Sequence, residues 1–317
     1  MLNLLHTKNN QQNSFKLPSS LLSMEKEEIS KLEQAGKIAQ EIKEYTKTIV
    51  KPNIPLLELA EKIEQKILDL GGKPAFPVNL SINEIAAHST PSYNDETLAQ
   101  GLLKIDIGVH IDGYVADTAI SFNISGSEEN KNLIKTAQSS LKKALETIKF
   151  NAKLSEIGKA IESEIISKNF QPIRNLSGHS IEQYNLHAGI TIPNHDNSSN
   201  IQIKEGVYAI EPFTTSGVGQ VVNGKPSGIY QLEKDGQVRD PFAREVLNYI
   251  KEEYQTLPFC SRWLVKKFNT KALIAIKRIE EANLLHNFSQ LIEKSKKPVA
   301  QAEHTIIIQK NKKTITT

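Results

Sequence analysis

Apolar side chains recur at helical spacing in four stretches of the chain. One stretch begins just after Met24, where Ile29 and Leu32 open a series of three- and four-residue steps that reaches Ile49. A second runs from Pro55 to Gly71–Gly72, and proline and glycine mark the limits of helices. The same spacing predicts further helices at 128–148 and 155–168.

A β-hairpin is predicted at 103–122, where apolar and polar residues alternate around Asp112–Gly113. This dipeptide is the strongest short signal of a two-residue hairpin turn. The turn pairs Gly108 with Asp117, and the period of two then places Asp106 and Asp117 on the same face of the sheet. The two aspartates become diagonal neighbours about 7–8 Å apart at the backbone. Gly108 leaves room between them.

Residues 240–290 differ from the rest of the chain. Asp240–Pro241 is a helix cap followed by proline at the first helical position, and helices are expected at about 241–254, 261–267 and 270–285. We interpret 232–290 as a small helical insert within a main domain of residues 25–317. A polar tail rich in Asn and Gln, residues 1–24, precedes this domain and is expected to be disordered. Alternating helix pairs and antiparallel strands predict an α+β fold.

Composition excludes several classes of protein. The 39 basic and 36 acidic residues give a net charge of +3, without the dense basic face of a DNA-binding protein. The purest apolar stretch, Ala272–Ile276, is far shorter than the roughly 20 residues of a membrane helix. The single cysteine, Cys260, excludes an internal disulfide, and no secretory signal precedes the domain. We therefore expect a cytoplasmic protein without DNA or membrane partners.

Acidic residues in unusual surroundings suggest a metal site. Asp106 and Asp117 would raise each other's pKa unless a cation lay between them, although a solvated pair on an exposed strand is an alternative. Glu211 and Glu303 adjoin apolar strands, where an unpaired desolvated charge costs several kcal/mol. Together with one histidine they offer oxygen and nitrogen ligands without a thiolate, which suits Mn, Fe, Co or Zn.

Six segments, in order along the chain, resemble the type II methionine aminopeptidases, most closely the short archaeal form, over about residues 25–317. The segments are Phe76–His88, the Asp106…Asp117 hairpin, Gly178–His179, Leu186–Gly189, Ala209–Phe213 and Glu303–Thr305. The insert between Glu211 and Glu303 favours type II over type I. The resemblance implies a pita-bread fold and a metallo-exopeptidase that removes the N-terminal methionine from nascent proteins whose second residue is small.

The resemblance also implies a role for each matched residue. Two divalent ions (Co, Mn, Fe or Zn) would be held by Asp106, Asp117, His179, Glu211 and Glu303, with Asp117 and Glu303 as bridges. His88 and His187 correspond to the two active-site histidines of the family. The methionine pocket would be lined by Phe76, Leu186 and Phe213, with His195 at its edge.

The chemistry implied by this ligand set is hydrolysis by a bridging hydroxide. Two metals about 3.5–4 Å apart would lower the pKa of a shared water toward about 7. Glu211 would accept its proton and pass it to the leaving amine. His187 would donate a hydrogen bond to the reacting peptide as charge develops, and His88 would help to position the next amide.

Other functions stay open at this stage. One is a catalytically inactive protein of the same fold that binds nucleic acid or other partners. Another is a Xaa-Pro aminopeptidase, although such enzymes usually carry a long additional N-terminal domain. Four lysine pairs, at 142–143, 266–267, 296–297 and 312–313, are interpreted as solvated faces, with transient ribosome contact as an alternative. The family favours a monomer, and His110 is interpreted as a structural residue.

Overall fold

The computed structural model describes residues 24–317, so the predicted tail, apart from Met24, lies outside the described residues. Its helices are α1 (Lys26–Ile49), α2 (Leu56–Asp69), α3 (Glu128–Thr147), α4 (Leu154–Ile166), α5 (Pro241–Glu253), α6 (Ser261–Phe268) and α7 (Lys271–Glu281). All four helices expected before residue 170 are confirmed. The expected end of the last helix at 285 is wrong: α7 stops at Glu281 because a strand begins at Leu285.

The strands pair antiparallel in four sheets. They are β1 (Lys73–Pro74), β2 (Asn79–Ile82), β3 (Ile85–Ala87), β4 (Leu102–Ile111), β5 (Tyr114–Asn123), β6 (Gln171–Pro172), β7 (Ser177–Ile181), β8 (Thr191–Pro193), β9 (Gly206–Ile210), β10 (Phe213–Thr215), β11 (Val221–Leu232), β12 (Phe259–Cys260), β13 (Leu285–Glu293), β14 (Val299–Gln301), β15 (His304–Gln309) and β16 (Lys312–Ile315). Helices and antiparallel sheets together confirm the α+β class.

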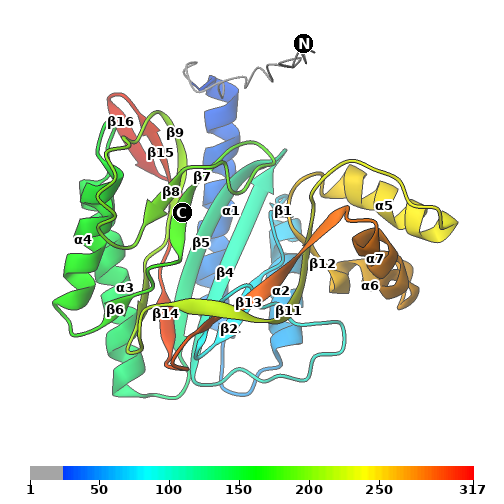
Figure 1. The fold of residues 1–317 in the computed structure, drawn as a ribbon, viewed down its shortest axis with the longest axis horizontal. Helices are drawn as coiled ribbons and strands as arrows, with labels where there is room; N and C mark the ends of the chain where they lie inside the picture. The colour runs from blue at the N-terminus through cyan, green and yellow to red at the C-terminus, as the bar shows by residue number, and fades with distance from the viewer. Residues whose placement is uncertain (1–23) are drawn as a thin grey trace, which may run out of the picture.

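The hairpin of β4 and β5 has the register that the sequence predicted, with Gly108 opposite Asp117. Asp112 and Gly113 both have positive φ, 49° and 83°, as a type I′ turn requires. The apolar face of the hairpin packs on α1 and α2, where residues such as Ile107 and Ile63 are fully buried. Figure 1 shows α1 behind this hairpin and α2 to its right.

A second half of the molecule is built from β7, β8, β9, β15 and β16, with α3 and α4 packed beside them (Figure 1). It meets the hairpin along β5, where side-chain hydroxyls make the cross-strand bonds. Ser121 Oγ exchanges two hydrogen bonds with the backbone of Gln301, and Thr118 donates to the carbonyl of Glu303. Thr305 bonds both backbone groups of Asp117. These bonds bring two of the predicted ligands next to each other.

The insert helices α5, α6 and α7 lie together at the right of Figure 1. They bury their own apolar cluster, which includes Leu247, Leu264 and Ile276. Cys260, next to this cluster, is fully buried, and burial raises the pKa of its thiol to about 12. Within residues 24–317 no helix combines the length and apolar character needed to cross a membrane.

Candidate metal centre

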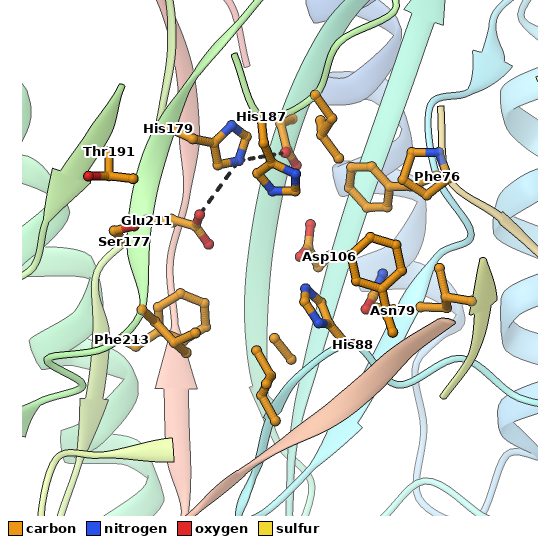
Figure 2. A pocket seen from close by; sticks show the side chains of 18 of the residues that line it. Phe76, Asn79, His88, Asp106, Ser177, His179, His187, Thr191, Glu211 and Phe213 are labelled. Carbon is orange, nitrogen blue, oxygen red and sulfur yellow. Dashed lines mark ion pairs between the residues drawn. The ribbon is translucent and has the colours of Figure 1, made fainter. Parts of the chain in front are cut away.

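A cavity of about 290 Å³ opens between the two halves of the molecule. The hairpin half contributes Phe76, His88 and Asp106, and the opposite half contributes His179, Glu211 and Phe213, as Figure 2 shows. Residues that are far apart in the sequence therefore face one another across a single cavity. Asp117, Leu186 and His187 also line it.

His179 lies at the centre of the acidic residues. Its Nε2 is 3.7 Å from Oδ2 of Asp117 and 3.6 Å from Oε1 of Glu211 (Figure 2, dashed lines). One ligand atom from each of Asp117, His179 and Glu303 can be chosen so that all three lie within 4.8 Å of one another. Glu303 is 1% exposed and does not itself line the cavity.

The charges of these groups do not balance without a cation. Burial raises the pKa of all four carboxyl groups, to about 6 for Asp106 and well above the ordinary value for Asp117, Glu211 and Glu303. Repulsion between the carboxylates adds to the effect at Asp117, Glu211 and Glu303. Burial lowers the pKa of His179 to about 3, so its imidazole is neutral and free to act as a ligand. A divalent cation would offset the repulsion between the carboxylates and would lower their pKa values again.

The polar atoms of the site fit a metal. Among residues 24–317, three buried carboxylate oxygens here have no hydrogen-bond partner: Oδ1 of Asp106, Oδ1 of Asp117 and Oε1 of Glu303. Buried polar atoms are rarely left unpaired in folded proteins. Four carboxylates and one imidazole are also the donors that Mn, Fe, Co and Zn accept. The residues present therefore match the ion that the sequence predicted.

Gln301 belongs to this site, although the sequence alone did not single it out. Its side chain is 2% exposed, and Nε2 lies 3.3 Å from Oε2 of Glu211 and 3.5 Å from Oε2 of Glu303. The amide thus donates to two carboxylates that come from different segments, Glu211 directly after β9 and Glu303 directly before β15. The available signal was spacing: Gln301 precedes Glu303 by two residues, which places both on the same side of an extended chain.

Gly108 provides space for a ring rather than for an ion. A Cβ at this position would lie 2.3 Å from Cε1 of Phe76. The expected room between the aspartates is therefore filled by the Phe76 ring, which forms part of the cavity wall. Leu186 and Phe213 line the same cavity and are 5% and 1% exposed.

The two active-site histidines predicted from the resemblance also face the cavity. The rings of His187 and His179 lie 4.4 Å apart, and burial lowers the pKa of His187. His88 has φ of 56°, a left-handed conformation that non-glycine residues seldom adopt outside turns and functional sites. Burial and the neighbouring His187 lower its pKa to about 4. Both imidazoles are neutral hydrogen-bonding groups at pH 7.

His195 is not part of the cavity wall. A Cβ at Gly158 of α4 would lie 2.0 Å from the backbone carbonyl oxygen of His195, so this loop packs closely on the helix. The placement of His195 at the edge of the pocket stays a prediction.

Comparison with known proteins gives relatives of nearly full length. Residues 30–263 match metallopeptidase family M24. The chain is 49% identical to a methionine aminopeptidase of Pyrococcus abyssi over 298 residues, which cover 92% of this chain and 99% of that protein. It is 42% identical to a methionine aminopeptidase of Methanocaldococcus jannaschii over 297 residues, which cover 93% of this chain and 100% of that protein.

Solved structures share the fold at low sequence identity. A thermophilic Arx1 aligns with a TM-score of 0.80 at 15% identity, covering 93% of this chain and 91% of that one. A methionine aminopeptidase from Rickettsia prowazekii aligns with a TM-score of 0.67 at 22% identity, covering 93% and 99% of the two chains. These two likenesses concern the fold alone, which is the predicted pita-bread arrangement.

Proposed function

The chain belongs to metallopeptidase family M24 and, within it, to the type II methionine aminopeptidases of archaeal form, and from this membership we propose how its own residues remove an N-terminal methionine. The observation that supports the proposal is that Asp106, Asp117, His179 and Glu211 line one cavity, while Asp117, His179 and Glu303 offer ligand atoms within 4.8 Å of one another. Each proposed role belongs to a side chain that lines this cavity or, for Glu303, lies beside it.

Two divalent ions, of Co, Mn, Fe or Zn, would be held by these five residues. Asp106 would serve one ion, His179 and Glu211 the other, and Asp117 and Glu303 both. Ions in such a site polarise a carbonyl and make water nucleophilic near neutral pH. Four carboxylates offset the charge of two divalent cations, which is why we propose a pair rather than a single ion.

Glu211 is the proposed proton carrier. It lines the cavity, and its Oε2 accepts a hydrogen bond from Gln301, which fixes the carboxylate toward the other ligands. From this position Glu211 accepts the proton of the attacking water and returns it to the leaving amine.

The cavity wall explains the preference for methionine. Phe76, Leu186 and Phe213 offer a buried apolar surface with no charged group among them. An unbranched thioether fits such a surface and gains from contact between sulfur and aromatic rings. The preference for a small second residue is proposed from the membership in the type II methionine aminopeptidases.

His187 and His88 are proposed to act on the peptide itself. His187 would donate a hydrogen bond to the scissile peptide, where charge develops during hydrolysis. His88 packs edge-on against Phe288, 5.2 Å between ring centroids, and so holds a fixed direction from which it can bond the following amide. Neither role requires a bond to metal.

We expect His187→Ala to slow turnover of a Met-Ala-Ser peptide by about 10²–10³, the effect of removing one donor to a transition state. Metal content, measured by elemental analysis, should stay at the wild-type value. His286→Ala, at another histidine packed on Phe288, serves as the control and should keep full activity. Loss of bound metal from the His187 variant would instead make His187 a ligand.

Gln301→Leu keeps the size of the side chain and removes the amide that joins Glu211 to Glu303. We expect metal affinity or turnover to fall by about 10–100-fold, as for other groups that orient metal ligands. Gln301→Asn keeps the amide but shortens the side chain, so it tests whether the amide must reach both carboxylates. Wild-type metal affinity and turnover in the leucine variant would show that the hydrogen bonds of Gln301 do not orient the two carboxylates.

The activity is tested by comparing peptides. Metal-supplemented protein should release methionine from Met-Ala-Ser and leave an Ala-Pro substrate intact. Cleavage of Ala-Pro alone would favour a Xaa-Pro aminopeptidase, and absence of both activities with no bound metal would favour an inactive binding protein of this fold. Identity of 49% to a methionine aminopeptidase, with a complete ligand set, argues against both alternatives.

Location and partners complete the proposal. A single buried cysteine suits the reducing cytoplasm, where nascent chains present their N-termini. We propose that the protein acts there as a monomer and meets the ribosome only transiently. Gel filtration with and without purified ribosomes measures both properties.

A further inference from the structure

A second cavity, of about 320 Å³, lies away from the metal centre, between α2 and the helical insert. None of the five proposed metal ligands lines it. Its walls come from α2, from Lys73 and Pro74 of β1, and from α5, α6 and the segment that joins them. The proposed reaction leaves this cavity without a role, although its volume is similar to that of the first.

His110 forms part of the floor of the second cavity. The residue is 6% exposed, and its Nδ1 accepts a hydrogen bond from the backbone N–H of Gly113 at 3.0 Å. Within residues 24–317 the ring makes no other hydrogen bond. Burial lowers the pKa of His110 to about 4, so the ring is neutral and its proton is on Nε2. The cavity floor therefore offers a hydrogen-bond donor that lacks an acceptor.

An aromatic wall stands at the insert side of the cavity. Tyr249, Tyr254 and Trp263 all line it. Tyr254 lies 5.8 Å from Tyr249 and 5.5 Å from Trp263 between ring centroids, so the three rings form one continuous surface. Such a wall contacts an apolar or flat body over a large area at little cost in conformational entropy.

The charges that line the cavity leave a positive excess. Arg262 is paired with Glu64 at 2.6 Å, and Lys73 is paired with Glu253 at 2.8 Å. The remaining charged groups of the lining are Glu61, Lys266 and Lys267, and none of them makes an ion pair within the described part of the chain. Lys267 already stands over the Tyr249 ring at 5.3 Å, which disfavours a second cation there.

We propose that this second cavity is a binding site for a small amphipathic carboxylate. The carboxylate would accept the hydrogen bond of His110 and lie in the field of Lys266 and Lys267, and its apolar body would lie against the aromatic wall. The donor comes from β4, the two lysines from α6, and the rings from α5, the residue after it and α6, so the match does not depend on one local feature.

The second cavity shares structure with the first. Pro74 lines the second cavity and is two residues from Phe76, which lines the first. Leu257 lines the second and its neighbour Pro258 lines the first. A bound carboxylate would therefore hold the wall of the methionine pocket in place, and its effect on the peptidase would appear in KM rather than in the metal content.

The chain itself supplies the reporter, because Trp263 is its only tryptophan. The probe is hydrocinnamate, whose phenyl ring does not absorb at tryptophan-selective excitation. Hydrocinnamamide and phenylpropylamine are its neutral and cationic counterparts at the same ionic strength. We expect a saturable change of Trp263 emission with the carboxylate and affinity at least about tenfold lower, 1.4 kcal/mol, for the other two.

Variants distinguish binding in the second cavity from binding elsewhere on the protein. His110→Phe and Lys266→Met should each weaken hydrocinnamate by about tenfold, and Lys312→Met, a solvated lysine of β16, should not. Saturating methionine, which fills the first cavity, should leave the response of Trp263 in place. Equal affinity for all three probes, no saturable response, or unchanged affinity in both variants would overturn the proposal. None of these results depends on peptidase activity.

Discussion

We expect Glu303→Gln to lower the peptidase activity by more than about 10³-fold, because loss of a proposed bridging ligand should cost more than loss of a single transition-state donor, worth about 10²–10³. The substitution keeps the volume of a side chain that is 1% exposed, so the effect is electrostatic rather than a packing defect. Metal content should fall at the same time. Turnover of Met-Ala-Ser and elemental analysis of the same preparation measure the two effects.

The melting temperature of the metal-free variant provides a second test that does not depend on activity. Glu303 lies among Asp117, Glu211 and Asp106, whose charges repel it in the absence of a cation. Replacing it with a neutral amide should raise the melting temperature of metal-free protein and abolish the stabilisation that added metal gives to the wild type. Glu293→Gln is the matched control, since Glu293 is equally buried but accepts its hydrogen bonds from Ser295, Lys297 and Val218. Full activity in Glu303→Gln would refute the ligand assignment.

Glu64→Ala should lower the free energy of unfolding by about 3–5 kcal/mol, the usual cost of leaving a buried charge without its partner. Glu64 of α2 binds both guanidinium nitrogens of Arg262 in α6, at 2.6 and 2.7 Å. It also accepts the indole N–H of Trp263 at 2.8 Å. Arg262 is 3% exposed, so water cannot replace the lost carboxylate. Urea denaturation followed by circular dichroism gives the change.

A double variant distinguishes the unpaired charge from lost packing. Glu64→Gln with Arg262→Met removes both charges and leaves an amide oxygen for Trp263, so it should recover part of the stability that Glu64→Ala loses. Glu58→Ala, which removes one surface ion pair of α2 with Lys62, should leave the urea midpoint unchanged. A loss below about 1 kcal/mol in Glu64→Ala would mean that the pair behaves as a solvated one.

Local pattern was enough to predict the hairpin that carries two of the ligands. Asp112–Gly113 fixes a type I′ turn, and the turn fixes the register that places Gly108 opposite Asp117. The same local rules gave α1 to α4, whose apolar stripes face the sheets. The end of α7 was missed because periodicity continues past Glu281, while pairing of β13 with β11 takes the chain from Leu285 onward.

The pattern of residues along the chain could not predict contacts between distant segments. Convergence of His179, Glu211 and Glu303 on the hairpin depends on the hydroxyl bonds between β5 and the last strands, and only the resemblance to a family implied it. Gln301 was missed for the same reason: its amide matters only once Glu211 and Glu303 are side by side. The role of Gly108 was misjudged because the Phe76 ring reaches it from a different segment.

The central claim is that four carboxylates and one imidazole of this chain hold a pair of divalent ions. Anomalous scattering from crystals grown with Mn tests it most directly. The account predicts two anomalous peaks at the first cavity, between Asp106, Asp117, His179 and Glu211, which line it, and Glu303, which adjoins them. Peaks elsewhere, or none in this cavity under conditions where the crystals cleave Met-Ala-Ser, would contradict it.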